Sequence, residues 1–330
     1  MQYRKFGRTE IQVSAIGFGG WGIADSENWG VQDPDGAVRA IQAAYEAGIT
    51  FFDTAEQYGD GESERMIGRA LRDVRDHVVL ATKVSRQQNT ASQVKKACER
   101  SLINLETDHI DLYQIHWPIP TSQVAEIFSA LDELRKQGKV RHIGVCNYGV
   151  KDLSSLVSKN KNLVSNQMAY NLLFRAIEHE ILPWCRKEQF SILCYSPLMQ
   201  GLLSGKYASA DSIPEARART RHFSSSRPLT RHGEAGCEVE VFRSLAEIQA
   251  IAQEVGESMS NVSIAWLLAQ PGIACVIAGA RSAFQSKQNA RAGTLILSES
   301  IIARLSKVTE IVKAKLGTNA DLWQSPSRIN

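Results

Sequence analysis

The chain has 330 residues, 43% of them hydrophobic, and a formal net charge of +3. One α/β barrel of this length can bury a large core, so the length does not by itself require two domains. The small net charge gives no reason to expect nucleic acid or a membrane surface as a partner. Six scattered cysteines without CxxC spacing, and an N-terminus without an apolar core, favour a cytoplasmic protein with reduced thiols.

Strand-like apolar runs recur along the whole chain. A short β-hairpin is predicted over residues 2–13, with its turn near Gly7 and Arg8. Eight further runs are separated by helical patterns, and they lie near residues 14–18, 49–52, 78–82, 110–115, 140–145, 163–167, 191–195 and 274–278. Alternating strands and helices predict a parallel sheet, and eight such units favour closure. We therefore predict an α/β fold, a (β/α)8 TIM barrel with a short N-terminal β-hairpin, as a single domain over residues 1–330.

Helix signals support this alternation. Asp33 and Pro34 can cap and start a helix that Gly48 ends. A second amphipathic segment, 124–138, ends at a glycine and carries basic residues in its last turn. The active site of such a barrel is expected at the carboxyl ends of its strands.

Three successive strand-like runs finish in an ionisable residue at that end. They end at Asp53, Lys83 and His116, and Tyr58 follows the first of them within a turn rich in glycine and aspartate. Taken singly, each has a structural alternative: a helix N-cap, a solvated strand end, a satisfied core histidine and a half-buried aromatic residue. Together they predict a catalytic group at the mouth of the barrel.

The four side chains suit proton transfer at a carbonyl or an alcohol. A tyrosine with an ordinary pKa near ~10 is a poor acid or base at neutral pH, and a neighbouring ammonium lowers that value. We expect Lys83 to supply this ammonium and Asp53 to keep it charged and oriented. His116 would hydrogen-bond the reacting oxygen, leaving Tyr58 to transfer the proton.

The longest irregular stretch, residues 209–237, is predicted to be a mobile loop insertion. It contains Arg217, Arg219, Arg221, Arg227, Arg231, His222 and His232. One hypothesis is a lid that meets an anionic cofactor or substrate; the alternative is a solvated loop, and composition does not separate the two.

Two other patterns in the sequence do not predict a binding site. Gly17, Gly19 and Gly22 satisfy GxGxxG, but no helix pattern follows them, so the dinucleotide-binding context is missing. No metal site is predicted, because His222 and His232 have no acids or thiols at a ligand spacing.

Several motifs together resemble the aldo-keto reductase family, in its bacterial form. DTAEQYG, ATK and QIHWP match the family's catalytic tetrad in order and spacing, at Asp53, Tyr58, Lys83 and His116. HIGVCNYG, SNQMAYN, CYSPLMQGLLSGKY and VIAGARSAFQSKQN resemble its motifs that contact a nicotinamide nucleotide. The resemblance implies NADPH as cofactor and cofactor contacts at Gly20, Trp21, Cys146, Asn147, Gln167, Tyr195, Ser196, Leu198, Gly201, Gly279, Arg281, Ser282, Gln285 and Asn289.

The resemblance also implies roles for individual residues, and the sequence departs from the family's motifs at two positions. Tyr195 would stack on the nicotinamide ring, and the guanidinium of Arg281 would bind the 2′-phosphate, which favours NADPH over NADH. Cys146 stands where the family usually has serine, and a thiol hydrogen-bonds more weakly than a hydroxyl. Ala278 replaces a usual proline, which loosens the backbone without removing a side-chain contact.

The function implied is NADPH-dependent reduction of an aldehyde or ketone, with Tyr58 as proton donor. Trp21, Trp29 and Trp117 are expected to contact the small-molecule substrate, although each could equally be packing. Two alternatives stay open: a sugar, polyol or alcohol dehydrogenase, and a regulatory subunit that senses the nucleotide with little turnover. The expected state is a monomer or a weak homo-oligomer, with no nucleic acid and no membrane.

Overall fold

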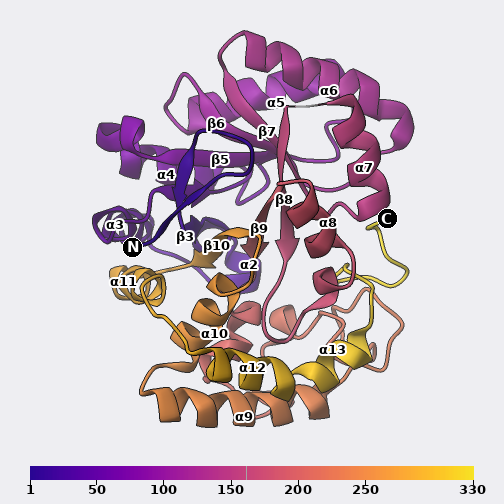
Figure 1. Ribbon diagram of the computed structural model, residues 1–330. Helices are drawn as coiled ribbons and strands as arrows, with labels where there is room; N and C mark the ends of the chain where they lie inside the picture. The colour runs from indigo at the N-terminus through magenta and orange to yellow at the C-terminus, as the bar shows by residue number, and fades with distance from the viewer. Residues whose placement is uncertain (161) are drawn as a thin grey trace.

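The computed structural model describes residues 1–160 and 162–330, and its centre is a closed barrel (Figure 1). Eight parallel strands pair in the order β10-β3-β4-β5-β6-β7-β8-β9. They are β3 (Ile16–Gly19), β4 (Phe51–Asp53), β5 (Val79–Val84), β6 (Ile110–Ile115), β7 (Val140–Cys146), β8 (Leu163–Ala169), β9 (Ser191–Tyr195) and β10 (Ile273–Gly279). The predicted (β/α)8 barrel is confirmed.

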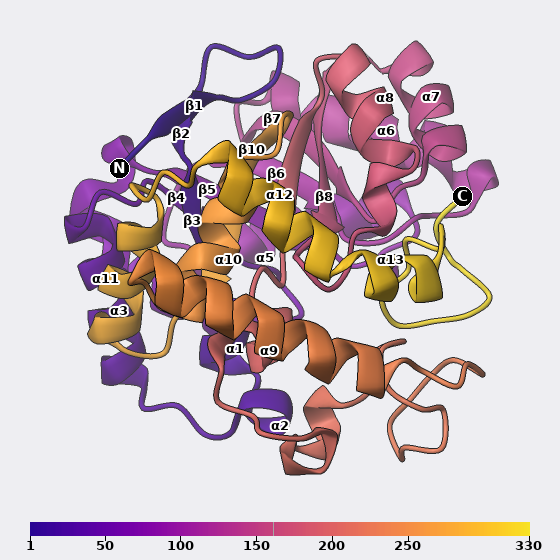
Figure 2. The same cartoon turned by 60° about the horizontal axis from the view of Figure 1, so that its bottom comes forward.

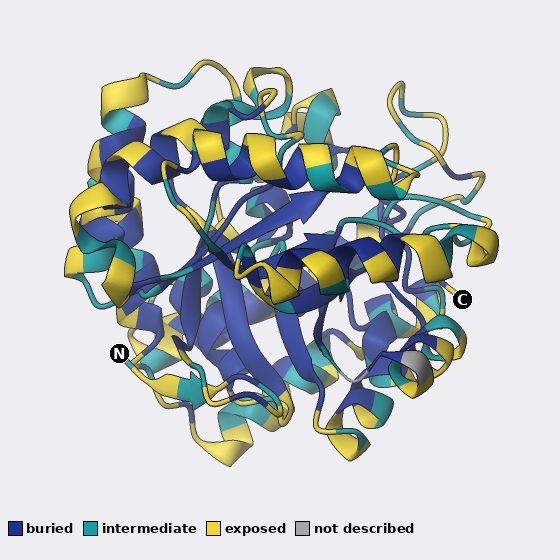
Figure 3. Ribbon diagram, turned by 90° about the horizontal axis from the view of Figure 1, so that it is seen from above, coloured by how far each residue is buried: buried dark blue, intermediate teal, exposed yellow. Residues whose placement is uncertain are grey.

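Helices surround the barrel and connect its strands. The connecting and closing helices are α3 (Pro34–Glu46), α4 (Glu62–Leu71), α5 (Ala91–Asn104), α6 (Thr121–Lys136), α7 (Val150–Lys159), α8 (Ile181–Lys187), α10 (Met259–Leu268) and α11 (Ala283–Ala292). Three more, α9 (Glu238–Val255), α12 (Glu299–Val308) and α13 (Glu310–Leu316), pack together beside the barrel. Seen from above, the strands are buried while the helices turn exposed faces outward (Figure 3). None of the helices among the described residues has the length and apolarity that crossing a membrane needs.

The predicted hairpin is present and covers one end of the barrel. Its strands are β1 (Tyr3–Lys5) and β2 (Gln12–Ser14), paired antiparallel. Phe6 and Val13 join the inward-facing apolar residues of the barrel strands in a core cluster of their own. Figure 2 shows the hairpin at one end of the barrel, and α2 (Ser26–Trp29) at the other. The hairpin therefore leaves only the opposite end open for a site.

The barrel interior changes from apolar to polar along the strands. Because side chains alternate across a strand, residues two apart point to the same side. Phe51 and Leu112 belong to the apolar inner cluster, and the inward positions two residues later are Asp53 and Gln114. These polar positions lie toward the carboxyl ends of the strands, which is where the site was predicted.

Two local predictions need correction. The segment after Gly19, which shows no helix pattern, forms two four-residue helices, α1 (Trp21–Ala24) and α2. Their preceding strand nevertheless belongs to the closed barrel, so the GxGxxG match is not a dinucleotide-binding fold.

The 209–237 segment is not simply a solvated loop. It contains two short 3-10 helices, Ala210–Ser212 and Glu215–Arg217. Its middle is anchored, because buried Arg221 pairs with Glu234 at 2.9 Å and donates to the carbonyl of Leu316 at 2.8 Å. The sequence pattern shows charge but not these long-range partners.

Candidate active site

The barrel strands place the predicted tetrad together. Asp53 is the last residue of β4, Lys83 is the last but one of β5, and His116 follows β6 directly. Tyr58 reaches the same place from the turn after β4. That turn needs Gly59, whose φ is +61° and where a Cβ would approach the carbonyl oxygen of Ala24 to 2.6 Å.

Lys83 links the acid and the phenol. Its ammonium donates to Asp53 Oδ1 at 2.5 Å, to the Thr54 carbonyl at 2.8 Å and to the Tyr58 hydroxyl at 3.4 Å. Lys83 is fully buried and Asp53 is 3% exposed, so water does not screen this pair. The ammonium thus has three oxygen acceptors in fixed positions.

The ionisation of Tyr58 differs from the prediction. Burial raises its pKa to about 12, and the nearby Lys83 ammonium offsets only part of that rise. Burial also acts to lower the pKa of Lys83, but attraction to Asp53 outweighs it and the pKa is raised. Desolvation, which the motif pattern does not report, thus has a larger effect on this pKa than the expected effect of the ammonium. Tyr58 is therefore protonated at neutral pH, as a proton donor must be.

His116 lies beside Tyr58 and is neutral. The two ring centroids are 5.8 Å apart in an edge-to-face arrangement. Burial, aided by the charge of Lys83, lowers the pKa of His116 to about 3. Its Nδ1 is buried and has no hydrogen-bond partner among the described residues. A neutral imidazole with an unused nitrogen can hydrogen-bond a substrate oxygen or a water.

Two amide side chains hold the far oxygen of Asp53. Gln167 donates to Asp53 Oδ2 at 2.8 Å, and Gln114 donates to the same atom at 3.1 Å. The thiol of Cys146 donates to Gln114 Oε1 at 3.7 Å. Cys146 and Gln167, both expected as cofactor contacts, are thus also parts of the network around Asp53.

A second hydrogen bond fixes the neighbouring wall. Tyr195 donates its hydroxyl to Asn147 Oδ1 at 2.9 Å, and Asn147 Nδ2 donates to the His116 carbonyl at 3.2 Å. Asn147 adopts a positive φ of 64°, which asparagine tolerates better than most residues. The ring of Tyr195 is therefore oriented by Asn147 at the end of β7, and Asn147 is itself bound to the backbone of His116 at the end of β6.

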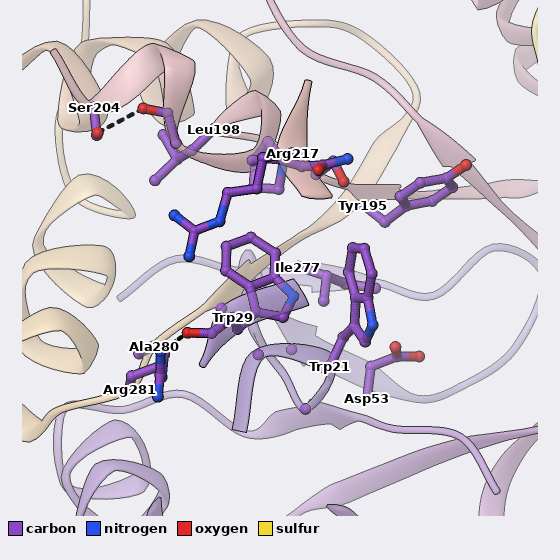
Figure 4. A pocket seen from close by; sticks show the side chains of 18 of the residues that line it. Trp21, Trp29, Asp53, Tyr195, Leu198, Ser204, Arg217, Ile277, Ala280 and Arg281 are labelled. Atoms are coloured by element: carbon purple, nitrogen blue, oxygen red, sulfur yellow. Dashed lines mark hydrogen bonds between the residues drawn. The ribbon is translucent and has the colours of Figure 1, made fainter. Parts of the chain in front are cut away.

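These residues surround a pocket of about 860 Å³ at the carboxyl end of the barrel. Figure 4 shows Trp29 and Trp21 in its middle, with Arg281 to one side and Tyr195 to the other. The predicted residues that line it are Gly20, Trp21, Trp29, Asp53, Tyr58, His116, Trp117, Cys146, Asn147, Gln167, Tyr195, Ser196, Leu198, Gly201, Gly279, Arg281, Gln285 and Asn289. Lys83 lies beneath this surface, and Ser282 caps α11 by accepting from the Gln285 amide at 3.3 Å.

The aromatic residues of the pocket touch one another. Trp21 packs edge-to-face on Trp29, with ring centroids 5.4 Å apart, and lies 6.5 Å from Tyr58. Its indole donates to Asp25 at 2.5 Å. Trp21 and Trp29 therefore support each other as well as lining the pocket.

Arg281 is already engaged within the chain. Its guanidinium donates to the carbonyls of Trp29, Gly30 and Val31 and to Gln32 Oε1, the last at 2.7 Å. We expected this guanidinium to be available for a phosphate. In the structure it fastens the segment between α2 and α3 to the start of α11.

Several residues of the site were not predicted as site residues. Lys206, which lines the pocket, and Gln114, which lies beneath it against Asp53, stand inside quoted motifs, but neither was given a role. Trp323 and Arg328 come from the C-terminal segment that follows α13. A tryptophan within a polar terminal stretch is a weak signal, because only the folded chain shows what it packs against.

A closed barrel with this tetrad at its mouth defines a class of enzyme. The model of the Aldo/keto reductase family matches residues 15–310. The chain belongs to this family, and it is an oxidoreductase.

Individual relatives agree with this assignment. The aldo-keto reductase YhdN of Bacillus subtilis (strain 168) is 33% identical over 293 residues, which cover 85% of each chain. The solved glycerol dehydrogenase of Gluconobacter oxydans is 27% identical, covers 93% of this chain and 94% of its own, and has a TM-score of 0.80. An aldo/keto reductase from Klebsiella pneumoniae, solved with NADP and acetate, is 28% identical over 94% of this chain and 96% of its own, with a TM-score of 0.74.

Proposed function

We propose that the chain reduces an aldehyde or ketone to an alcohol with NADPH, and that Tyr58 donates the proton. The observation that carries this proposal is the buried ammonium of Lys83, 3.4 Å from the Tyr58 hydroxyl and 2.5 Å from Asp53. A protonated phenol that faces a pocket beside a neutral imidazole is suited to a developing alkoxide.

The pocket residues fit a nicotinamide nucleotide. Gln200 Nε2 and His116 Nδ1 are buried at its wall without a partner among the described residues, so the wall has unused hydrogen-bonding groups. Lys206 and Arg217 offer positive charge for phosphates along the same wall. The bound cofactor would supply the hydride.

The chain's own residues do the remaining work. His116 orients the carbonyl oxygen toward Tyr58, and Tyr58 passes its proton to that oxygen. Lys83 stabilises the phenolate that is left, since opposite charges in a buried site attract strongly. Asp53, held by Gln114 and Gln167, keeps the ammonium in place.

A dehydrogenase working toward oxidation is the second candidate, favoured by the likeness to the Gluconobacter enzyme. The regulatory-subunit alternative differs from both because it predicts nucleotide binding with little turnover. Direction and turnover therefore separate the three candidates.

The first experiment follows NADPH oxidation at neutral pH with a panel of reactive aldehydes and ketones. We expect turnover, and we expect Tyr58→Phe to reduce it at least ~100-fold, because only the transferred proton is removed. NADPH binding, measured by fluorescence titration, should change less than about threefold. Loss of cofactor binding in the variant would contradict the role of Tyr58, and absence of turnover in the parent protein would favour oxidation or sensing.

A further inference from the structure

The pocket carries far more positive than negative charge. Its one described carboxylate, Asp53, is paired with Lys83. The cations that line it are Lys206, Arg217, Arg219, Arg231, Arg281 and Arg328. Asp321 neutralises one of these, Arg328, so five remain. An NADPH carries roughly three to four negative charges on its phosphates, which leaves a positive surplus in the pocket.

Three of these arginines stack on tryptophans, and two of them, Arg217 and Arg328, do so in different parts of the pocket. The Arg217 guanidinium lies 4.7 Å from the ring centroid of Trp29, the residue that Arg281 contacts. The Arg328 guanidinium lies 3.6 Å from the ring centroid of Trp117, the residue after His116. Arg328 is therefore the stacked cation on the tetrad side.

Arg328 is held in one orientation by buried groups. Asp321, which is fully buried, accepts from Arg328 Nε at 2.7 Å and from Nη2 at 2.9 Å. Asp321 itself is fixed by the backbone amides of Trp323, Gln324 and Arg328. One edge and one face of the guanidinium are thus occupied.

The other edge of the guanidinium is unused. Arg328 Nη1 donates no hydrogen bond to any residue that the structure describes, and the side chain is part of the pocket lining. Nη1 and Nη2 together form the end-on fork that binds a carboxylate through two parallel hydrogen bonds. A fixed guanidinium needs little ordering when a ligand arrives.

The flanking residues add to the attraction for an anion. Arg219 lies 5.1 Å from the ring centroid of Trp323, and Trp323 packs edge-to-face on Trp21 at 6.4 Å. The Nε of Arg219 is buried without a partner in the described chain. Burial and the neighbouring Arg231 lower the pKa of Arg219, and these two effects outweigh the opposing attraction of Asp25.

We infer that the site selects carbonyl substrates that carry a carboxylate, and that Arg328 binds this carboxylate. The inference rests on the proposed carbonyl reduction and adds the substrate class. The carbonyl oxygen would lie at Tyr58 and His116, while the carboxylate would lie on the free edge of Arg328 above Trp117. The competing explanation is that Arg328 only fastens the C-terminal segment to the barrel.

A pair of matched substrates separates these explanations. We would compare 4-carboxybenzaldehyde with its methyl ester, methyl 4-formylbenzoate, which has the same reacting aldehyde and no charge. For the parent protein we expect kcat/KM to favour the acid at least ~10-fold, as a charged hydrogen bond should give. Arg328→Met should bring this ratio near one, and Arg328→Lys, which keeps the charge without the fork, should give an intermediate ratio.

The matched control is Arg217→Met, which also removes a guanidinium stacked on a tryptophan but on the cofactor side. Its acid-to-ester ratio should stay within about threefold of the parent ratio. A structural role for Arg328 would lower kcat/KM for both substrates and keep the ratio, and that result would overturn the inference. An equal preference in the parent protein would overturn it too.

Failure of the proposed function is recognised separately. If neither aldehyde is reduced, calorimetry with 4-(hydroxymethyl)benzoate, the alcohol that reduction of 4-carboxybenzaldehyde would give, and the NADP-saturated protein still tests the anion site. Binding that weakens at least ~10-fold in Arg328→Met supports the carboxylate site without turnover. No binding to the parent protein would overturn it.

Discussion

In the polar layer inside the barrel mouth, three side chains hold the carboxylate of Asp53. Asp53 accepts from Lys83 through one oxygen and from Gln114 and Gln167 through the other. Gln114 does not line the pocket, so we propose that it acts on the reaction through Asp53, as a positioning residue. Loss of its amide would leave Asp53 with less restraint on Lys83 and Tyr58.

We therefore predict that Gln114→Leu lowers kcat about tenfold and changes NADPH affinity by less than about twofold. One buried hydrogen bond to a charged group is worth roughly 1.5–3 kcal/mol, of which part will be recovered by Gln167. The pH profile of kcat should also shift, since Lys83 acts on the phenol. Stopped-flow reduction at several pH values measures both effects.

Thr82→Val on the neighbouring strand, β5, is the control. It removes a buried hydrogen bond, from the Thr82 hydroxyl to Glu64 at 2.6 Å, away from the pocket. If both variants lose activity in parallel, with unchanged pH profiles, Gln114 is only a stabilising residue.

Among the elements, the segment between α2 and α3 is held in position by Arg281, the candidate contact of the cofactor's 2′-phosphate. Arg281, which precedes α11, holds it through three carbonyls and Gln32. A 2′-phosphate must compete with these acceptors for the guanidinium, and its greater charge makes it the stronger partner.

Arg281→Ala should weaken NADPH binding at least ~10-fold more than NADH binding, because only NADPH carries the 2′-phosphate. Fluorescence titration with both nucleotides gives the two dissociation constants. Gln32→Ala removes one acceptor and keeps the arginine, so it should preserve the preference. Equal losses for both nucleotides in Arg281→Ala would show that the residue only fastens the segment.

At the scale of the whole molecule, the hairpin and the site occupy opposite ends of the barrel. Phe6 is 2% exposed and packs on Phe51, with ring centroids 6.3 Å apart. The same strand that begins at Phe51 ends at Asp53. The residues packed at the hairpin end therefore stabilise the fold, and those at the opposite end form the site, as is usual in such barrels.

Phe6→Ala should destabilise the protein by about 3 kcal/mol, the usual cost of an emptied aromatic site in a core. Urea unfolding followed by circular dichroism should show a lower midpoint, while kcat/KM below the transition should change less than about twofold. Lys5→Ala, exposed on the same hairpin, should leave the midpoint nearly unchanged. A large loss of activity in folded Phe6→Ala would contradict the separation of the two ends.

The sequence by itself determined the barrel, the order of its strands along the chain and the positions of the tetrad. Apolar runs and helix caps are local signals, and a parallel barrel brings all strand ends to one mouth, so Asp53, Lys83 and His116 had to meet there. The hairpin turn was equally local.

Only the tertiary structure decided the ionisation of Tyr58, the partners of Arg281 and the place of the C-terminal segment. The pKa of Tyr58 depends on how completely its neighbours exclude water, and motif spacing does not report that. Arg281 meets carbonyls about 250 positions away in the chain. Arg328 reaches Trp117 because a polar segment after the last helix folds back over the mouth, a contact with no periodic pattern behind it.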